Sequence, residues 1–375
     1  MKVVVAVDSF KGSLSSMDAG FAVRDGILRA RPDAEIIVKP LADGGEGTTD
    51  ALIEGMGGER ISITVTGPLG KPVDAYYGYL KETGTAIIEM ASAAGIVLVP
   101  NGEKNPLTAT TFGVGEMIKD AAERGCRNFI IGLGGSVTND GGIGMLQALG
   151  YTFLDKNFQE TGQGAQALGK ITSIKTDNVY SKLKECHFQV ACDVTNPLCG
   201  KNGATYIYGP QKGVSGAMLD RLDADMSHFA AITSMVMGND FLETEGAGAA
   251  GGLGFALLSY LNARLIPGIE LILDAVRLQD ALKDADIAVT GEGRLDHQTA
   301  MGKAPVGVAR LAKRYNVKVL AFAGGVTKDA RACNKAGIDA FFPIVRGITT
   351  LEEAMEPENA RANMTDTVEQ VFRII

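Results

Sequence analysis

The sequence has no tryptophan, no C-x-x-C pair, and no apolar run of the roughly 18 residues that a membrane-spanning helix requires. Its five cysteines match no zinc motif and are odd in number, so we expect buried thiols in a reducing cytoplasm rather than a disulfide framework. The apolar segment Lys2 to Val7 is too short for the core of a signal peptide and is followed at once by Asp8. These absences predict a cytoplasmic protein with no membrane partner.

Charge of one sign is not concentrated anywhere in the chain. The 36 basic and 44 acidic residues give a formal net charge of -8 without a run of five or six like charges. This pattern argues against a nucleic-acid partner and against a polybasic membrane patch, and an anionic small substrate would need a locally positive pocket. The composition leaves the oligomeric state open.

Two nucleotide-binding patterns are missing or out of context. The strict phosphate-loop pattern G-x-x-x-x-G-K-[ST] does not occur. The segment Gly246 to Gly251 matches G-x-G-x-x-G, but it follows the charged residues FLETE rather than a buried strand. A glycine-rich helix that approaches another segment closely explains this match better than a dinucleotide site.

The two ends of the chain alternate between short apolar segments and amphipathic ones, which indicates a parallel sheet covered by helices. Near the N-terminus we expect strands at Lys2 to Val7 and Glu35 to Val38, another strand that ends in PLADGGEGT, and a helix from Met17 to Ala30. Near the C-terminus we expect strands at residues 286–290, 317–323 and 340–345, and helices at residues 304–313 and 328–335.

The middle of the chain differs, because apolar and polar residues alternate with a period of two over 61–66 and 73–79, as in antiparallel strands. We predict an α/β fold in which a Rossmann-like parallel-sheet domain, residues 1–60 and 281–375, is interrupted by a second, inserted mixed α/β domain, residues 61–280. The active site is expected in the cleft between them. Two consecutive domains are the alternative, and the pattern does not assign residues 104–150 to either domain.

Two polar turns in the N-terminal part are candidate binding sites. In VDSFKGSLSS a strand ends at Asp8, Lys11 lies in the turn, and Ser15 has the spacing of a helix cap, so the free N–H groups and the lysine favour an anion. In PLADGGEGT, Asp43 and Glu46 could accept a hydrogen bond from a substrate hydroxyl or hold Mg2+. A capped helix and an acidic glycine turn are the alternatives.

The segment GLGGSVTNDGG follows the apolar strand that ends at Ile131. Backbone N–H groups of Gly134, Gly135 and Ser136 are able to form an anion-binding nest, and Asn139 next to Asp140 would add polar contacts. A tight connection between a strand and a helix would explain the glycines but not the packed polar residues.

The segment ACDVTNPLCG places Asp193 at the end of an apolar strand, before a turn at Asn196 and Pro197, and Lys212 follows in GPQKG. An acid in this position suits a metal site or a base that accepts the proton of a substrate hydroxyl. An Asx turn before the proline is the alternative.

The segment GEGRLDHQTAMGKAP combines an arginine, carboxylates and a lysine in what reads as a short turn. Arg294 suits a carboxylate or phosphate, Asp296 or Glu292 suits Mg2+, and Lys303 stands at a helix start where phosphate charge is favoured. With only three histidines in the chain and none at ligand spacing, His297 is interpreted as a polar loop residue.

Together these segments resemble the bacterial glycerate kinase type 1 family. VDSFKGSLS, PLADGGEGT, GLGGSVTNDGG, ACDVTNPLCG, GPQKG and GEGRLDHQTAMGKAP occur in the order of that family and extend over most of the chain. The resemblance implies ATP-dependent phosphorylation of D-glycerate with Mg2+, usually giving 2-phosphoglycerate, by a Rossmann-like domain with an inserted second domain.

The resemblance and the chemistry of the residues together give a set of hypothetical roles. The catalytic residues would be Lys11, Asp193 and Arg294. Substrate binding would involve Ser9, Lys11, Asp43, Glu46 and Arg294. The nucleotide phosphates would be bound by Gly134, Gly135, Ser136, Asn139, Lys212 and Lys303, and Mg2+ by Asp193 and Asp296.

Three other functions stay open at this point. The chain could phosphorylate the 3-hydroxyl or another small hydroxy acid, because the motifs do not determine which hydroxyl faces the nucleotide. It could be a non-catalytic regulator that binds glycerate or a nucleotide, although sensing would not need both a metal site and a base. A nicotinamide oxidoreductase would rest on the glycines near Gly246 alone.

Overall fold

The computed structural model describes residues 1–45 and 47–375 and divides them into two compact units. The first unit comprises Met1–Asp43, Asp50–Gly57 and Ile269–Ile375, and the second comprises Gly44–Thr49 and Gly58–Gly268. The second unit is therefore an insertion in the first, and the predicted α/β fold class is confirmed. Within the described residues, no helix has the length and apolar character needed to cross a membrane.

In the described part of the first unit, five strands form one parallel sheet in the order β13-β12-β11-β1-β2. The strands are β1 (Lys2–Val7), β2 (Glu35–Pro40), β11 (Ile287–Leu295), β12 (Lys318–Val326) and β13 (Ala340–Pro343). The helices are α1 (Ser16–Ala30), α2 (Thr48–Met56), α10 (Gly268–Ala275), α11 (Leu278–Leu282), α12 (His297–Ala300), α13 (Ala304–Lys313), α14 (Ala332–Lys335), α15 (Leu351–Met355) and α16 (Pro357–Phe372).

The sheet is wound in two directions from its middle. The chain steps from β1 to β2 on one side, and from β11 through β12 to β13 on the other. Because crossovers between parallel strands are right-handed, these opposite steps place α1 and α13 on opposite faces of the sheet. The order reverses between β1 and β11, and in doubly wound sheets such a reversal opens a crevice at the carboxyl ends of the strands.

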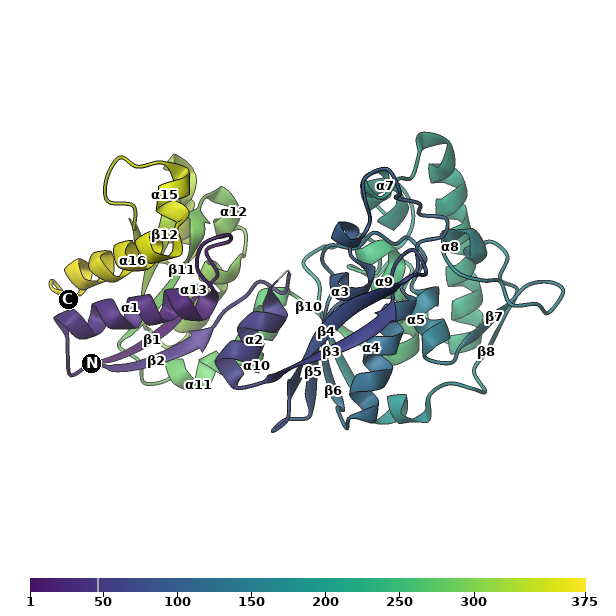
Figure 1. The fold of residues 1–375 in the computed structure, drawn as a ribbon, viewed down its shortest axis with the longest axis horizontal. Coiled ribbons are helices and arrows are strands. Elements are labelled where there is room, and N and C mark those ends of the chain that lie inside the picture. Colours follow the sequence, from purple (N-terminus) through teal and green to yellow (C-terminus); the bar gives the residue numbers. More distant parts are fainter. Residues whose placement is uncertain (46) are drawn as a thin grey trace. The chain divides into compact units, whose positions relative to one another are not determined.

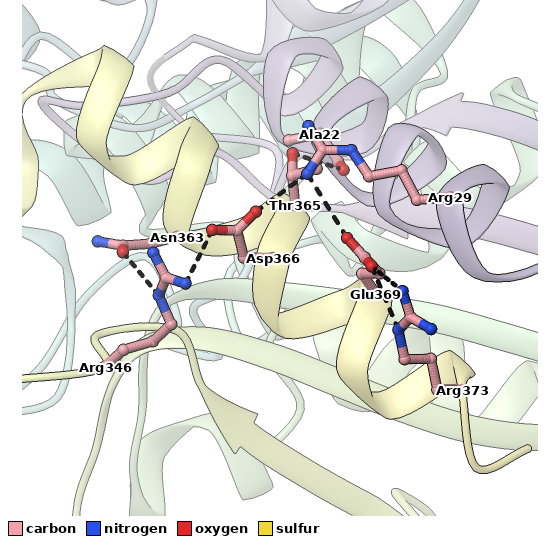
Figure 2. A network of polar contacts seen from close by, with 8 residues as sticks. All are labelled: Ala22, Arg29, Arg346, Asn363, Thr365, Asp366, Glu369 and Arg373. Carbon is pink, nitrogen blue, oxygen red and sulfur yellow. Dashed lines mark hydrogen bonds and ion pairs between the residues drawn. The ribbon is translucent and has the colours of Figure 1, made fainter.

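The C-terminal helix α16 packs beside α1 on the same face (Figure 1). The contact is close, because a Cβ atom on Gly26 would lie only 2.4 Å from the carbonyl oxygen of Thr365, whose hydroxyl donates to Ala22 O at 3.1 Å. Figure 2 shows Arg29 of α1 beside Asp366 and Glu369 of α16, with N–O distances of 3.0 and 3.6 Å. The end of the chain is thus part of the first unit's core.

In the second unit, the described residues form a six-stranded mixed sheet in the order β10-β9-β6-β5-β4-β3 and a two-stranded antiparallel sheet of β7 and β8. The strands are β3 (Glu59–Thr66), β4 (Pro72–Leu80), β5 (Thr85–Glu89), β6 (Asn128–Gly132), β7 (Thr152–Leu154), β8 (Ser173–Lys175), β9 (His187–Ala191) and β10 (Arg264–Ile266). The helices are α3 (Ala91–Ala94), α4 (Phe112–Glu123), α5 (Ile143–Ala148), α6 (Ala165–Leu168), α7 (Ala204–Tyr208), α8 (Gly216–Met237) and α9 (Ala249–Leu261).

The two hydrophobicity patterns of the sequence, period-two alternation and short apolar runs, correspond to two parts of this sheet. Strands β3 and β4 are antiparallel, as their period-two alternation predicts, whereas β5, β6, β9 and β10 run parallel to one another. Residues 104–150, whose place the pattern left open, lie in the second unit.

Several predicted boundaries are wrong, among them that of β12, which extends to Val326 rather than to residue 323. No separate strand precedes PLADGGEGT, because β2 itself extends to Pro40 and leads directly into that loop. Strand β11 does not end at residue 290 but continues to Leu295, since its backbone pairs with β12 as far as Val326. The charged segment that begins at Gly291 is therefore partly a strand, and Glu292 and Arg294 lie on it.

The close contact of α1 with α16 gives a test of the fold. Gly26→Ala should lower the free energy of unfolding by about 2 kcal/mol, because the new methyl group would overlap Thr365 O and the Val368 side chain. Urea unfolding followed by circular dichroism measures this change. Gly216→Ala, at the start of α8 with open space around it, is the control and should be neutral or slightly stabilising. Equal stability of the two variants would contradict the packing described.

Candidate active site

A cavity of about 500 Å3 opens in the first unit at the carboxyl ends of β1 and β11, where the strand order reverses. Six of the residues selected from the sequence line it: Ser9, Lys11, Asp43, Arg294, Asp296 and Lys303. Asp8 and Glu292 also line it, together with an apolar wall that includes Phe10 and residues of α15. Three motifs, two near the N-terminus and one in the C-terminal part of the sequence, therefore contribute to one cavity.

Close backbone contacts fix the floor of this cavity. The Asp8 amide donates to the carbonyl oxygen of Gly291 at 2.9 Å, which extends the pairing of β1 with β11 by one bond. A Cβ atom on Gly324 would lie 2.7 Å from the carbonyl oxygen of Gly293, so glycine lets β12 approach β11 at this point. The glycines among the charged residues thus serve the packing of strand ends.

Asp8 is the most strongly perturbed carboxyl group of the cavity. It is 7% exposed and accepts a hydrogen bond from the Ser9 amide at 2.7 Å. Burial, with the negative charges of Asp43 and Glu292 nearby, raises the pKa of Asp8 to about 7. The sequence placed Asp8 at a strand end but gave no sign of this environment, and a perturbed carboxyl group in a cavity is typical of a functional site.

Glu292 and Asp296 are held by the start of α12. The Thr299 hydroxyl donates to Glu292 Oε1 at 2.5 Å, and burial raises the pKa of Glu292 above its usual value. Asp296 is the N-cap of this helix: its Oδ1 accepts from the amides of Gln298 and Thr299 at 2.9 and 3.2 Å. One oxygen of the expected metal ligand Asp296 is therefore engaged by the helix, whereas Oδ2 lies 3.9 Å from Arg294 Nε.

The cationic side chains of the cavity have few internal partners. Lys11 Nζ lies 3.9 Å from Asp43 Oδ2, and the Lys11 and Arg294 side chains are 72% and 70% exposed. Lys303 is also exposed, at the N-cap of α13. No acceptor among the described residues takes a hydrogen bond from these three side chains, so their N–H groups are directed to solvent or to a ligand.

The remaining candidates lie in the second unit, where Gly134 and Gly135 follow β6 and are exposed. Gly135 has a φ of 75°, and the turn is fixed by bonds from Ile96 N to Gly135 O at 2.7 Å and from Val137 N to Ala94 O at 3.1 Å. Within the described chain, the amides of residues 134–136 donate to no protein acceptor. Free amides of successive residues at a glycine turn are suited to bind an anion.

Lys212 supports this turn from the protein interior. Its side chain is 2% exposed, and its Nζ donates to Ser136 Oγ and to Thr138 O, both at 2.7 Å. Burial lowers the pKa of Lys212 to about 7, partly offset by the negative charge of Asp140. Lys212 therefore contacts the turn directly and holds it in place.

Asn139 and Asp140 are buried completely beneath the same turn. Asn139 donates to the Thr205 hydroxyl at 3.1 Å, and Asp140 accepts from the amide and the hydroxyl of Thr111, both at 2.9 Å. The glycines at the start of α9 pack against this segment, since a Cβ atom on Gly251 would lie 2.1 Å from Thr138 O. The G-x-G-x-x-G match is thus explained by close backbone approach, as the sequence indicated.

Asp193 follows β9, the neighbour of β6 in the sheet, and Ala191 of β9 pairs with Gly132 of β6. It is exposed, and its Oδ1 accepts from the Gly268 amide at 2.8 Å, which orients the carboxylate. Gly44 lies across these strand ends, because a Cβ atom there would meet Ala191 and Gly268 at 2.8 Å. Part of the PLADGGEGT loop therefore belongs to this second group of residues, whereas Asp43 belongs to the first and Glu46 lies outside the described residues.

The expected site residues thus form two groups, one in each unit. The described residues contain no cluster of three or more histidine, cysteine or acidic side chains arranged to hold a metal ion. All five cysteines are free thiols. An exposed anion-binding turn beside an acid, and a cavity with cations beside a buried acid, are features of enzymes that act on anionic substrates.

Comparison with known proteins agrees with these features. The model of the glycerate kinase family matches residues 3–375. A glycerate kinase of Bacillus subtilis is 49% identical over 95% of this chain and 93% of its own length, and the glycerate 2-kinase of Escherichia coli is 46% identical over 94% and 93%. A crystal structure from Salmonella typhimurium LT2, named as a glycerate kinase 2, has a TM-score of 0.92 and 44% identity, covering 100% of this chain and 98% of its own. The chain is therefore an enzyme of the glycerate kinase family.

The environment of Asp8 predicts a pH-dependent stability. A carboxyl group whose pKa rises from 3.8 unfolded to about 7 folded destabilises the fold as the pH rises through this window. Asp8→Asn keeps the acceptor for the Ser9 amide and should raise stability by about 1 kcal/mol at pH 4.5 and by up to about 4 kcal/mol at pH 8. Urea unfolding at the two pH values measures the difference.

A second carboxyl group provides the control for this experiment. Asp284 is exposed, and its hydrogen bond with Lys2 holds its pKa below the usual value. Asp284→Asn should therefore change stability by nearly the same amount at pH 4.5 and at pH 8, because both pH values lie above the unfolded and the folded pKa of Asp284. If the effect of Asp8→Asn were also the same at both pH values, the burial of an unfavourable charge at Asp8 would be refuted.

Proposed function

We propose that this protein transfers the γ-phosphoryl group of ATP to the 2-hydroxyl of D-glycerate, giving ADP and 2-phosphoglycerate. Its membership of the glycerate kinase family supports the acceptor, and the name of the Escherichia coli relative, glycerate 2-kinase, supports the position of phosphorylation. The roles below are assigned within each unit separately.

The observation that carries this proposal is the set of Lys11, Arg294 and Lys303 side chains around one cavity, without acceptors among the described residues. Both reactants are anions, and phosphoryl transfer requires neutralised phosphate oxygens more than covalent chemistry from the protein. Arg294 provides a planar donor group for two oxygens, whereas Lys11 and Lys303 provide point charges. Four carboxyl groups line the same cavity, so the three cations are available to a ligand but do not make the cavity positive overall.

In the second unit, the turn at residues 134–136 would bind an anionic group through its amides, with Lys212 fixing the Ser136 hydroxyl from below. A carboxylate and a phosphate share the chemistry that such a turn recognises. Asp193, oriented by the Gly268 amide on the adjacent strand end, would accept the proton of the attacking hydroxyl. A hydroxy acid whose carboxylate binds near this turn would place its hydroxyl within reach of an acid.

The carboxylates fit a magnesium ion that arrives with ATP. Magnesium is commonly bound by one or two carboxylates together with phosphate oxygens, so the lack of a three-ligand cluster in the described residues is compatible with it. Asp296, through Oδ2, is the candidate ligand in the first unit, and Asp193 is the candidate in the second. When bound, the ion would neutralise charge on the phosphates.

The reaction gives the first test. Purified protein supplied with Mg-ATP should release ADP only when D-glycerate is present, and phosphorus and carbon NMR should identify a phosphate on C2. A phosphate on C3 would leave the assignment as a kinase intact but would show that the 3-hydroxyl, not the 2-hydroxyl, is phosphorylated. Absence of turnover by demonstrably folded protein, over a panel of small hydroxy acids, would reject the proposed reaction.

The proposed base gives the second test. Asp193→Asn should lower kcat at least about 100-fold with little change in KM, because the amide can still accept from Gly268 but cannot take a proton. Asp177→Asn, which alters another exposed acid of the same unit, should behave as the unaltered enzyme. If Asp193→Asn turned over at a near-normal rate, another group would have to accept the proton.

A further inference from the structure

The cavity of the first unit has an apolar side that the acceptor substrate does not explain. Beyond its charged floor it is lined by Phe10, Ile344, Val345, Leu351, Ala354, Met355 and Ala360. D-glycerate is a three-carbon acid with a polar group on every carbon, so it has no apolar surface to match this wall. At about 500 Å3 the cavity lies in the range of sites that enclose larger organic ligands.

Three of these apolar residues, Leu351, Ala354 and Met355, belong to the short helix α15. None of the residues of this helix is buried, and Leu351 is 77% exposed although it is a large apolar residue. The helix start is nonetheless well formed, because Thr350 and Glu353 form a capping box in which Thr350 Oγ1 accepts from the Glu353 amide at 3.2 Å. An ordered helix that leaves apolar side chains facing a cavity is a suitable surface for a flat apolar ligand.

The apolar and the cationic sides of the cavity are adjacent. A Cβ atom on Gly12 would lie 3.0 Å from Met355 Cε, so α15 reaches the turn that carries Lys11. Ala354 and Met355 therefore face the same cavity as Lys11 and Arg294. A ligand that satisfies both sides has an apolar ring system at one end and several negative charges at the other.

Of the two proposed reactants, only the nucleotide has this character. We propose that the first unit binds the nucleoside triphosphate, with the base against Leu351, Ala354 and Met355 and the phosphates toward Lys11, Arg294 and Lys303. This inference rests on the proposed phosphoryl transfer for the identity of the ligand. The position agrees with the general location of ligands in doubly wound sheets, at the strand ends where the order reverses.

This assignment divides the residues expected to bind nucleotide. Lys303 stays with the nucleotide, whereas Gly134, Gly135 and Ser136 of the second unit become available for the carboxylate of the acceptor. Lys11 and Arg294 then contact the phosphates of the nucleotide rather than the carboxylate of the acid.

The absence of tryptophan from the chain allows a direct test by fluorescence. Leu351→Trp would place an indole on the proposed wall, and Ile348→Trp would place one three residues earlier at an exposed position that does not line the cavity. Titration with Mg-ADP should quench or shift the emission of Leu351→Trp in a saturable manner and leave Ile348→Trp unchanged, and D-glycerate alone should change neither. A response of Leu351→Trp to D-glycerate but not to Mg-ADP would overturn the proposal.

Kinetics of a second variant separate this site from the reaction itself. Leu351→Ser should raise KM for ATP about tenfold and leave KM for D-glycerate unchanged, because it removes an apolar contact with the base alone. Ile348→Ser should change neither constant.

The two experiments together distinguish the site from the reaction. Normal turnover by Leu351→Ser with an unchanged KM for ATP, together with no response of Leu351→Trp to Mg-ADP, would refute the nucleoside site but leave the proposed reaction standing. Saturable Mg-ADP binding by Leu351→Trp without turnover of D-glycerate would support the site and reject the reaction.

Discussion

The parallel pairing of β1 with β11 is the interaction on which the first unit depends. It joins residues from opposite ends of the sequence, with Val3 opposite Ile287 and Val5 opposite Val289. Because the order of the sheet reverses at this pair, the pairing also creates the crevice that Asp8 and Glu292 line. The candidate site residues of both motifs line one cavity only because these two strands are neighbours.

The two units present different kinds of groups to a negatively charged ligand. In the first unit, exposed cationic side chains line a cavity in which burial raises the pKa of Asp8 and of Glu292. In the second, backbone amides are fixed by a rigid turn that rests on the buried ammonium group of Lys212. Side-chain charges adapt to a group that changes during the reaction, whereas fixed amides suit a group that keeps its shape.

The sequence predicts well those parts of the fold in which the signal is local. Strand β1 and helix α13 have the predicted bounds, because an apolar run ending at Asp8 and a periodic segment with Pro305 near its start are sufficient signals. The extension of β11 to Leu295 was not predictable, because glycine and charged residues have low strand propensity and form a strand there only through pairing with β12.

The same limit applies to the site. Composition and position identified exposed groups such as Lys11, Arg294 and Asp193 as candidates, and the structure places the first two at one cavity. Composition and position did not distinguish Asn139 from an exposed ligand. Its side chain is buried and donates to Thr205, a residue distant in the sequence. Polar residues in a glycine-rich motif look alike until the partners that cover some of them are known.

The insertion of the second unit between β2 and β11 has a consequence for the order in which the protein forms on the ribosome. Residues 58–268 are contiguous and complete their own sheet before β11 is synthesised. The second unit is therefore able to fold before the first unit has the strands β11, β12 and β13 of its sheet. During that time β1, with the apolar sequence VVVAV, has β2 as a neighbour but an open edge on its other side. An apolar open edge is a template for wrong pairing, so the interval before β11 emerges is the period in which the nascent chain most needs protection from aggregation.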